Sequence, residues 1–503
     1  MKESILQRSI SGTAVGLIAF GFSLATNLLQ VTLLLSVWTQ EQYGHWLLLL
    51  SAATVATALD GGHQLYIGNQ LNREQVEDRQ RMLITLGSAV RVAAFLGVGQ
   101  IIVLSVTVVS GWIYPILGLE PGSPPGFSFG LLAYTFLWIS TGSIGSILVR
   151  LFLPAGYYVR SMWWNLVTRA CQFLALIMAA RSGWSLPAVA TAYGMVAFCL
   201  SLAVFADLKR LLPEYWPWWQ AGSLKIGFKN FGRSSVITFT SLLDNVSQQG
   251  ILIIITHGIG VIAVPLFTTL RTVSNTAMQG GTFLLNPVNA DIIRFRITEQ
   301  YTKLIGLFRM YWLVITFVMN FGLILLFAWV EPIYKIWTGG KLIFDIHLFL
   351  WLSVAVLFRS LGLPFVVLLQ SLNRLRVQVA LSMVRVVLCV GGSIIFMQPF
   401  GLSGIALAVA LSELFGSLVI PFLFILKELK TTKFNSVGLG WPLAGTCVTA
   451  ALMACSSFDQ LSSSRLTVIS FIILACCAWM QWRNIDESLR LRLRSHTPKF
   501  LRP

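Results

Sequence analysis

The hydrophobic pattern of the chain is a succession of long apolar segments separated by short polar loops. A transmembrane helix needs about 20 mostly apolar residues, with a range of roughly 17–25. Fourteen segments meet this length, near 11–37, 45–70, 84–112, 128–152, 159–180, 185–206, 232–257, 259–286, 304–330, 346–370, 375–397, 403–426, 438–457 and 466–482. The pattern therefore predicts an all-α polytopic membrane protein with about fourteen transmembrane helices.

Lysine and arginine are concentrated in alternate loops. If the N-terminus is cytoplasmic, the only lysines and arginines in the loops on the outer side are Arg181, Lys335, Lys341 and Arg465. Cytoplasmic loops of membrane proteins are rich in Lys and Arg, and an error of one helix in the count would mix the two sets. The charge bias supports the fourteen segments and predicts that both termini are cytoplasmic.

The sequence also indicates an internal duplication. Related residues recur at one constant spacing in the two halves: Arg160 with Arg376, Arg169 with Arg385, and Gly44 with Gly260. Segments one to six and seven to twelve have the same predicted orientation, as in the parallel repeats of transporters. This predicts five regions: an N-terminal six-helix lobe (1–206), a cytoplasmic linker (207–231), a C-terminal six-helix lobe (232–426), two additional transmembrane helices (427–482) and a basic cytoplasmic tail (483–503).

Composition narrows the function classes. Charged residues make up 11% of the chain, compared with about 25% in soluble proteins. The net charge of +17 is explained by the basic cytoplasmic loops, so nucleic-acid binding is not predicted. The seven cysteines lie in apolar segments without metal-ligand spacing, and no nucleotide-binding or hydrolase motif is present. We expect no enzyme activity, metal or cofactor; transport would use a proton or sodium gradient, or run downhill.

Eight charged residues lie inside the apolar segments and away from the segment ends: Arg91, Arg169, Arg271, Arg359, Arg385, Asp60, Asp244 and Glu413. A charge at the bilayer centre costs about 2.5–3.5 kcal/mol on insertion scales, so such residues usually face the protein interior or a water-filled cavity and serve a function. Arginines outnumber acids here. The surplus favours an anionic ligand such as a phosphate, which arginine binds with a bidentate fork.

Two neighbouring segments carry polar stripes. The eighth has Thr268, Arg271, Asn275, Gln279, Thr282 and Asn286 at the 3.6-residue period of a helix, and the seventh has Ser234, Thr238, Ser241, Asn245 and Gln248 beside Asp244. Lipid would not tolerate these faces. They predict a hydrated cavity between the lobes, with a polar helix–helix seam as the alternative. Arg271, Asn275, Gln279 and Asn245 are the substrate-binding candidates from these stripes.

The other intramembrane charges are assigned by position. Arg359 is too central in its segment to snorkel and is a further substrate-binding candidate. Arg169 and Arg385 lie nearer the cytoplasmic side, where snorkelling or ion pairing is an equal alternative, and are secondary candidates. Arg91, nearer still to that side, is interpreted as structural.

The three intramembrane acids have two interpretations. Asp60, Asp244 and Glu413 are candidates for proton or ion coupling, or are counter-ions of nearby arginines. Pairing of Asp244 with Arg271 is the simplest alternative to a substrate contact of Arg271, because their helices are consecutive.

Several stretches resemble bacterial polysaccharide flippases of the O-antigen (Wzx) type. They are the Tyr43-Gly44-His45-Trp46 turn with Asp60-Gly61-Gly62 at the end of the following segment, the basic stretch SLNRLRVQVALSMVRVVL (371–388), and PFGLSGIALAVALSELFG (399–416) with its Gly401, Gly404 and Ala406. With the arrangement of six, six and two helices, the resemblance covers almost the whole chain. It extends to the superfamily that unites multidrug exporters, lipid II flippases and O-antigen flippases.

This resemblance implies a V-shaped pair of lobes around a cationic central cavity. Alternating access would turn the head group of a polyprenyl-pyrophosphate-linked oligosaccharide across the bacterial inner membrane, for O-antigen, capsule or exopolysaccharide synthesis. Its partners would be membrane lipids and other polysaccharide assembly proteins, and its last two helices would form a groove for the lipid tail.

Two alternatives share the fold, namely an ion-coupled multidrug or metabolite exporter and a lipid II flippase. The positive intramembrane charge disfavours export of cationic drugs. The first segment has no arginine beyond Arg8, whereas lipid II flippases have an arginine cluster there, which disfavours the second alternative.

Overall fold

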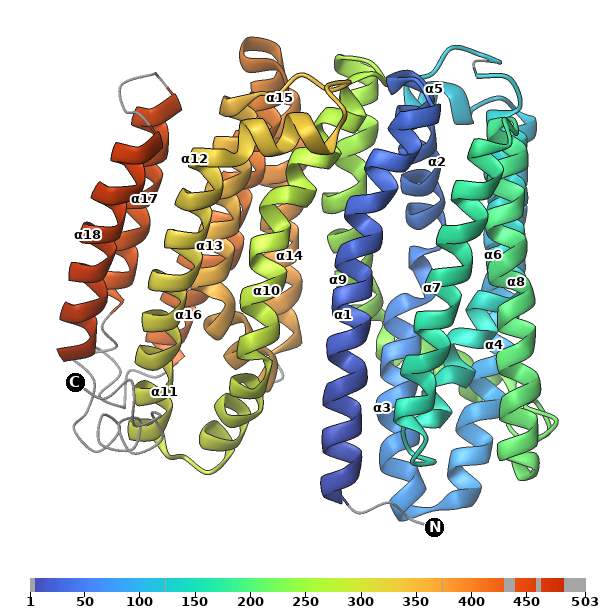
Figure 1. Ribbon diagram of the computed structural model, residues 1–503. Coiled ribbons are helices and arrows are strands. Elements are labelled where there is room, and N and C mark those ends of the chain that lie inside the picture. Colours follow the sequence, from blue (N-terminus) through green and yellow to red (C-terminus); the bar gives the residue numbers. More distant parts are fainter. Residues whose placement is uncertain (1–4, 123, 373, 429–438, 458–462, 484–503) are drawn as a thin grey trace. The chain divides into compact units, whose positions relative to one another are not determined.

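The computed structural model describes residues 5–122, 124–372, 374–428, 439–457 and 463–483, and these residues contain helices but no strand (Figure 1). All fourteen predicted segments are helical over most of their length. The prediction of an all-α polytopic membrane protein is confirmed. The chain divides into two compact units, the first comprising residues 1–265 and 337–342 and the second residues 266–336 and 343–503.

Unit 1 contains the first seven predicted segments. Its helices are α1 (Ile5–Val37), α2 (Gln40–Ala56), η1 (Ala58–Asp60), α3 (Gly61–Glu77), α4 (Arg79–Val109), α5 (Ile113–Leu117), α6 (Phe127–Val149), η2 (Arg150–Phe152), α7 (Tyr158–Arg181), α8 (Leu186–Leu211), η3 (Pro213–Tyr215) and α9 (Leu224–Gly258). Thr39 caps α2, because its hydroxyl accepts a bond from the Gln42 amide while the Gln42 side chain accepts from the Thr39 amide. The second predicted segment is divided between α2 and α3 by the short helix η1.

The core of unit 1 lies among α3, α4, α6 and α8. Fully buried apolar side chains such as Ile67, Leu86, Leu148 and Leu208 meet there. The loop after α8 is fastened to this core, because Arg91 donates hydrogen bonds to the carbonyl oxygens of Gly222 (2.6 Å) and Trp219 (3.0 Å). These bonds agree with the structural interpretation of Arg91.

Helix α9 packs on α2, α3 and α4 and so belongs to unit 1. At Gly62 of α3, an added Cβ would lie 2.2 Å from the backbone nitrogen of Thr238 in α9, so only glycine permits this approach. The compact units are therefore divided near Pro265, later than the lobe boundary predicted at 206–232. The predicted lobes rest on sequence symmetry, and they stay a prediction.

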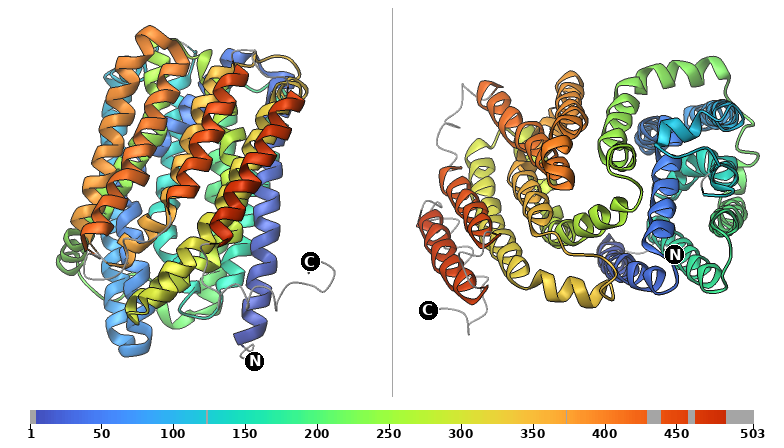
Figure 2. Two further views of the ribbon diagram at one scale, coloured as in Figure 1. Left: turned by 90° about the vertical axis from the view of Figure 1, so that its left-hand side faces the viewer. Right: turned by 90° about the horizontal axis from the view of Figure 1, so that it is seen from above.

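Unit 2 contains the remaining segments. Its helices are α10 (Ala263–Ile297, whose first turn lies in unit 1), α11 (Tyr301–Val314), the π-helix η4 (Ile315–Met319), α12 (Asn320–Trp337), α13 (Ile346–Ser371), α14 (Leu375–Val386), the π-helix η5 (Val387–Gly391), α15 (Gly392–Glu413), the π-helix η6 (Leu414–Val419), α16 (Ile420–Glu428), α17 (Gly440–Ser457) and α18 (Ser463–Arg483). Helices α17 and α18 lie side by side at one edge of this unit (Figure 2), where α17 packs on α13 and α18 on η4. Phe471 of α18 contacts the rings of Phe317 and Phe321.

Length and composition mark seven helices of the described residues as able to cross a membrane: Val15–Val37, Arg79–Val109, Phe127–Phe152, Leu186–Leu211, Tyr301–Trp337, Ile346–Leu369 and Arg376–Lys427. Helices α7, α9 and α10 fall outside this group and contain Arg169, Asp244 and Arg271. Arg359, Arg385 and Glu413 lie within the group, in Ile346–Leu369 and Arg376–Lys427.

Gly401 forms the sharp turn between the eleventh and twelfth predicted segments. Within α15 the chain kinks at Gly401, whose φ of 57° and ψ of −136° lie outside the helical region. Three residues later, a Cβ at Gly404 would lie 2.0 Å from the Phe396 carbonyl oxygen. The two glycines of the PFGLSG motif therefore serve the chain reversal, one through its conformation and the other through its lack of a side chain.

Replacing Gly401 with alanine is expected to destabilise the protein by about 1–3 kcal/mol, because a side chain is strained in that backbone conformation. Thermal unfolding of the detergent-solubilised protein measures the effect as a lower melting temperature. Gly322→Ala in α12 is the matched control, since an added Cβ there meets nothing within 4 Å. Equal melting temperatures for the two variants would contradict the role assigned to Gly401.

Candidate functional site

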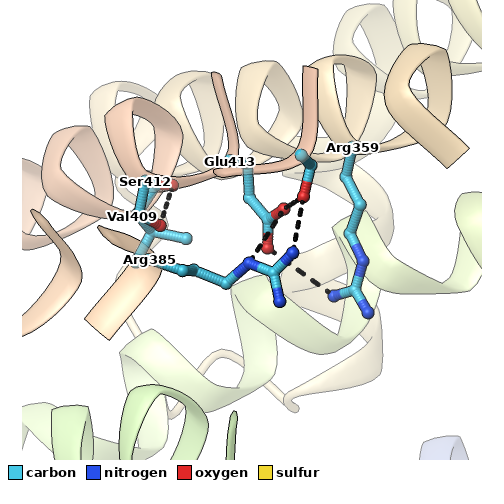
Figure 3. A network of polar contacts seen from close by, with 6 residues as sticks. Arg359, Arg385, Val409, Ser412 and Glu413 are labelled. Atoms are coloured by element: carbon cyan, nitrogen blue, oxygen red, sulfur yellow. Dashed lines mark hydrogen bonds and ion pairs between the residues drawn. The ribbon is translucent and has the colours of Figure 1, made fainter. Parts of the chain in front are cut away.

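Three of the charged residues predicted from sequence meet in unit 2 (Figure 3). Arg359 lies on α13, Arg385 on α14 and Glu413 at the end of α15. Glu413 Oε1 is 3.8 Å from Arg359 Nη1, and Glu413 Oε2 is 3.9 Å from Arg385 Nε. Arg385 Nη2 donates to the Ser417 hydroxyl at 3.0 Å, and that hydroxyl donates to Glu413 Oε2. We call these four residues the arginine–glutamate cluster.

The cluster is positioned by close helix packing and by two π-helices. At Gly362 an added Cβ would lie 2.0 Å from the Ser417 carbonyl oxygen, so α13 approaches η6 at backbone distance. Helix η5 begins two residues after Arg385, and η6 begins directly after Glu413 and contains Ser417. Because π-helices often occur at functional sites, where they redirect side chains, these two segments support a functional role for the cluster.

The charges in the cluster do not balance. Two guanidinium groups share one carboxylate, which leaves one net positive charge. The side chain of Glu413 is only 11% exposed and that of Arg385 20%, whereas that of Arg359 is 44% exposed. Because the ion pair of Arg359 is long and its side chain is partly exposed, most of its five N–H donors can bond to a ligand. The cluster can therefore bind an anion, with Arg359 as its most accessible group.

Arg271 belongs to the same compact unit as the cluster. It is half-buried on α10, and its guanidinium carbon is 5.7 Å from the centre of the Phe267 ring, a cation–π contact. It also interacts electrostatically with Cys389, one helical turn after Arg385. Asn275 is half-buried and Gln279 exposed on the following turns of α10. The side chains of Thr282 and Asn286 lie outside those described.

The polar stripe of the seventh segment has a different environment. Ser234 and Thr238 are buried, and Ser234 Oγ is 3.2 Å from His63 Nδ1 of α3. This part of the stripe is a polar helix–helix seam, which was the alternative to a hydrated cavity. Asn245 donates to the Ser241 carbonyl oxygen at 2.9 Å within its own helix. Asp244 lies in unit 1 and Arg271 in unit 2, and both assignments of Arg271 stay predictions.

The remaining two candidates, Arg169 and Asp60, lie in unit 1 on different helices, α7 and η1. Arg169 is exposed on α7 and donates to the Ser23 hydroxyl of α1 at 3.2 Å. Arg169 thus differs from Arg385, its counterpart in the predicted repeat, whose side chain is 20% exposed and lies beside Glu413. Asp60 is 2% exposed, and the side chains of Gln64 and Ser143 approach its carboxylate, but no residue in the described part of the chain forms a hydrogen bond with Asp60 Oδ2. Such a buried acid suits the predicted proton or ion coupling.

Sequence reasoning missed Ser417, the residue that links Glu413 to Arg385. Its signal was available, because a hydroxyl four residues after an intramembrane acid lies on the same helical face. The convergence of Arg359, Arg385 and Glu413 was not predicted, since it depends on packing between three helices.

The sequence matches no protein-family model and no curated protein sequence. Its fold is similar to an inward-facing multidrug-resistance MATE-family transporter of the MOP superfamily, with 14% identity over 82% of this chain and 96% of the other and a TM-score of 0.61. Similarity to the lipid II flippase MurJ in an inward closed conformation covers 94% of this chain and 98% of the other, with 12% identity and a TM-score of 0.58. A MOP-superfamily transporter from Pyrococcus furiosus, described as having a binding pocket of reverse polarity, matches with 14% identity over 84% and 96% of the chains and a TM-score of 0.57. The chain has the fold of these membrane transporters.

Proposed function

We propose that this protein is a bacterial inner-membrane transporter that flips a polyprenyl-pyrophosphate-linked oligosaccharide by alternating access. The product would serve polysaccharide synthesis, as O-antigen, capsule or exopolysaccharide. The observation that carries the proposal is the arginine–glutamate cluster, in which Arg359 and Arg385 share the single carboxylate of Glu413.

A pyrophosphate fits the chemistry of this cluster. Arginine presents a planar fork of donors that matches phosphate oxygens, and its charge does not depend on pH in the physiological range. Two guanidinium groups held near one carboxylate repel each other, and a bound anion would relieve this repulsion. Arg271, on helix α10 of the same compact unit, would add a third cation.

The fold comparisons support a lipid-linked substrate over a drug. The match to the lipid II flippase covers 94% of this chain, compared with 82–85% for the multidrug transporters. The positive charge of the cluster also disfavours cationic drugs, which an acidic site would bind better.

A deletion strain tests this function. Loss of the protein is expected to cause accumulation of a polyprenyl-linked oligosaccharide on the cytoplasmic face of the membrane, and expression of the wild-type chain is expected to remove it. Drug susceptibility of the strain is expected to stay unchanged. Broad drug sensitivity without accumulation of a lipid-linked glycan would instead establish the multidrug exporter, and accumulation of lipid II would establish the lipid II flippase.

A further inference from the structure

Unit 1 contains a cavity of its own, with a volume of about 540 Å³. Its walls are formed by α3, α6, η2, α7 and α8, and its lining includes Asn72, Trp138, Arg150, Trp164 and Asn165. All of these elements belong to one compact unit. The volume lies within the range of about 300–1,000 Å³ that is usual for small-molecule sites.

The lining combines amide and hydroxyl groups with aromatic rings. Five amide side chains face the cavity: Gln64, Asn69, Asn72, Asn165 and Gln172. An amide can donate and accept at once, as a hydroxyl does, so this set complements a ligand that carries several hydroxyl groups. Trp138 and Trp164 provide apolar ring faces with a polar edge. A saccharide has both properties, because hydroxyl groups surround its ring while its faces carry C–H groups.

The two tryptophan rings are fixed in place. The Trp164 indole donates to Asp207 Oδ2 at 2.8 Å, and Asp207 is itself held by two hydrogen bonds from Arg160, of 2.7 and 2.6 Å. Trp138 packs over Gly142, where an added Cβ would lie 3.0 Å from the ring. Rigid aromatic walls lower the entropic cost of binding, which is typical of a prepared site.

Arg150 provides a buried donor without a partner. Its side chain crosses α3 at Gly68, where an added Cβ would lie 2.3 Å from Arg150 Cδ. Its Nε atom is buried, and no described residue accepts a hydrogen bond from it. A buried donor left without a partner costs about 1–3 kcal/mol, so a polar ligand in the cavity would be bound partly through this atom.

We infer that this cavity binds a sugar residue of the lipid-linked oligosaccharide, with its amides and Arg150 bonded to sugar oxygens and its indoles against the ring. The inference rests on the proposed function and adds a saccharide site separate from the arginine–glutamate cluster, which would bind the pyrophosphate. The protein would thus recognise the glycan as well as the anionic anchor.

Binding of two probes to the purified full-length protein, measured by native mass spectrometry, tests this site. The probes are undecaprenyl pyrophosphate and undecaprenyl-pyrophosphate-linked N-acetylglucosamine. The wild-type protein is expected to bind the glycosylated probe about tenfold more tightly, the gain expected for one or two hydrogen bonds and a ring contact. Trp138→Leu and Gly68→Ala are each expected to abolish this difference while leaving the affinity for the bare lipid unchanged.

Two matched controls separate the site from general effects. Trp163→Leu alters an exposed tryptophan outside the cavity, and Gly61→Ala adds a methyl group in α3 where nothing lies within 4 Å. Both are expected to keep the tenfold preference. Equal wild-type affinity for the two probes, or loss of preference in the controls as in the cavity variants, would overturn the saccharide site and leave the proposed function standing. Failure of the wild type to bind either probe would overturn both.

Discussion

Replacing Arg359 with alanine is expected to lower export of the lipid-linked glycan at least tenfold while leaving the protein folded in the membrane. Arg359 is the most exposed member of the arginine–glutamate cluster, and its ion pair to Glu413 is long, at 3.8 Å. Its loss therefore removes a ligand contact more than a structural one. A hydrogen bond to a charged group contributes roughly 1.5–3 kcal/mol, which corresponds to a tenfold effect or more.

Surface polysaccharide restored in the deletion strain measures this effect, with the amount of membrane protein determined in parallel. Arg181→Ala is the matched control, because Arg181 is an exposed arginine at the end of α7 that is predicted to lie in an outer loop. The control is expected to export normally. Full export by Arg359→Ala, or an equal defect in both variants, would contradict the assignment of Arg359 as a substrate contact.

Glu413→Gln is expected to destabilise the protein and to make its stability depend on an added anion. The substitution leaves Arg359 and Arg385 close together without a carboxylate between them. Removing one partner of a buried ion pair costs about 3–5 kcal/mol, and less here because Arg359 is partly exposed. A ligand that binds the folded state raises its stability by mass action, so inorganic pyrophosphate is expected to recover part of the loss.

Melting temperatures of the solubilised protein, with pyrophosphate or with sodium chloride at equal ionic strength, measure this dependence. Ser412→Ala is the neighbouring control, since the Ser412 hydroxyl donates within its own helix, to the Val409 carbonyl oxygen at 2.8 Å. Pyrophosphate is expected to raise the melting temperature of Glu413→Gln more than that of the wild type or the control. The same shift in all three proteins would argue against an anion site at the cluster.

The membrane helices were predictable because one physical rule determines them. Backbone groups in lipid must bond within a helix, so each apolar stretch of sufficient length becomes one. Local departures from regular helices were not predictable in the same way. The break at η1 and the π-helices η5 and η6 leave no signal in apolar periodicity, because they depend on contacts with neighbouring helices.

The candidate site was predictable as a set of residues but not as an arrangement. Arg359, Arg385 and Glu413 were each identified by the cost of a charge in lipid. Their meeting depends on close approaches such as that of Gly362 to Ser417, which no single-helix pattern contains. The polar stripe that includes Ser234 has a further ambiguity. Its pattern predicts that the stripe does not face lipid, but not whether it faces water or another helix, and here Ser234 lies against His63.

The proposed saccharide cavity was not predictable from sequence, because none of its lining residues stands out individually as a binding residue. Asn72, Asn165 and Gln172 are common polar residues of helix ends and interfaces, and Trp164 reads as an interfacial aromatic. Only the packing of α3, α6, η2, α7 and α8 brings them to one cavity.

Reconstitution into liposomes tests the central claim most directly. Vesicles contain undecaprenyl-pyrophosphate-linked N-acetylglucosamine, and a membrane-impermeant glycosyltransferase added outside modifies only the lipids of the outer leaflet. Wild-type protein is expected to make nearly all of the probe accessible, whereas Arg359→Ala is expected to leave about the accessible fraction of protein-free vesicles. Wild-type vesicles that behave like protein-free ones would contradict the assignment of this protein as a flippase of lipid-linked oligosaccharides.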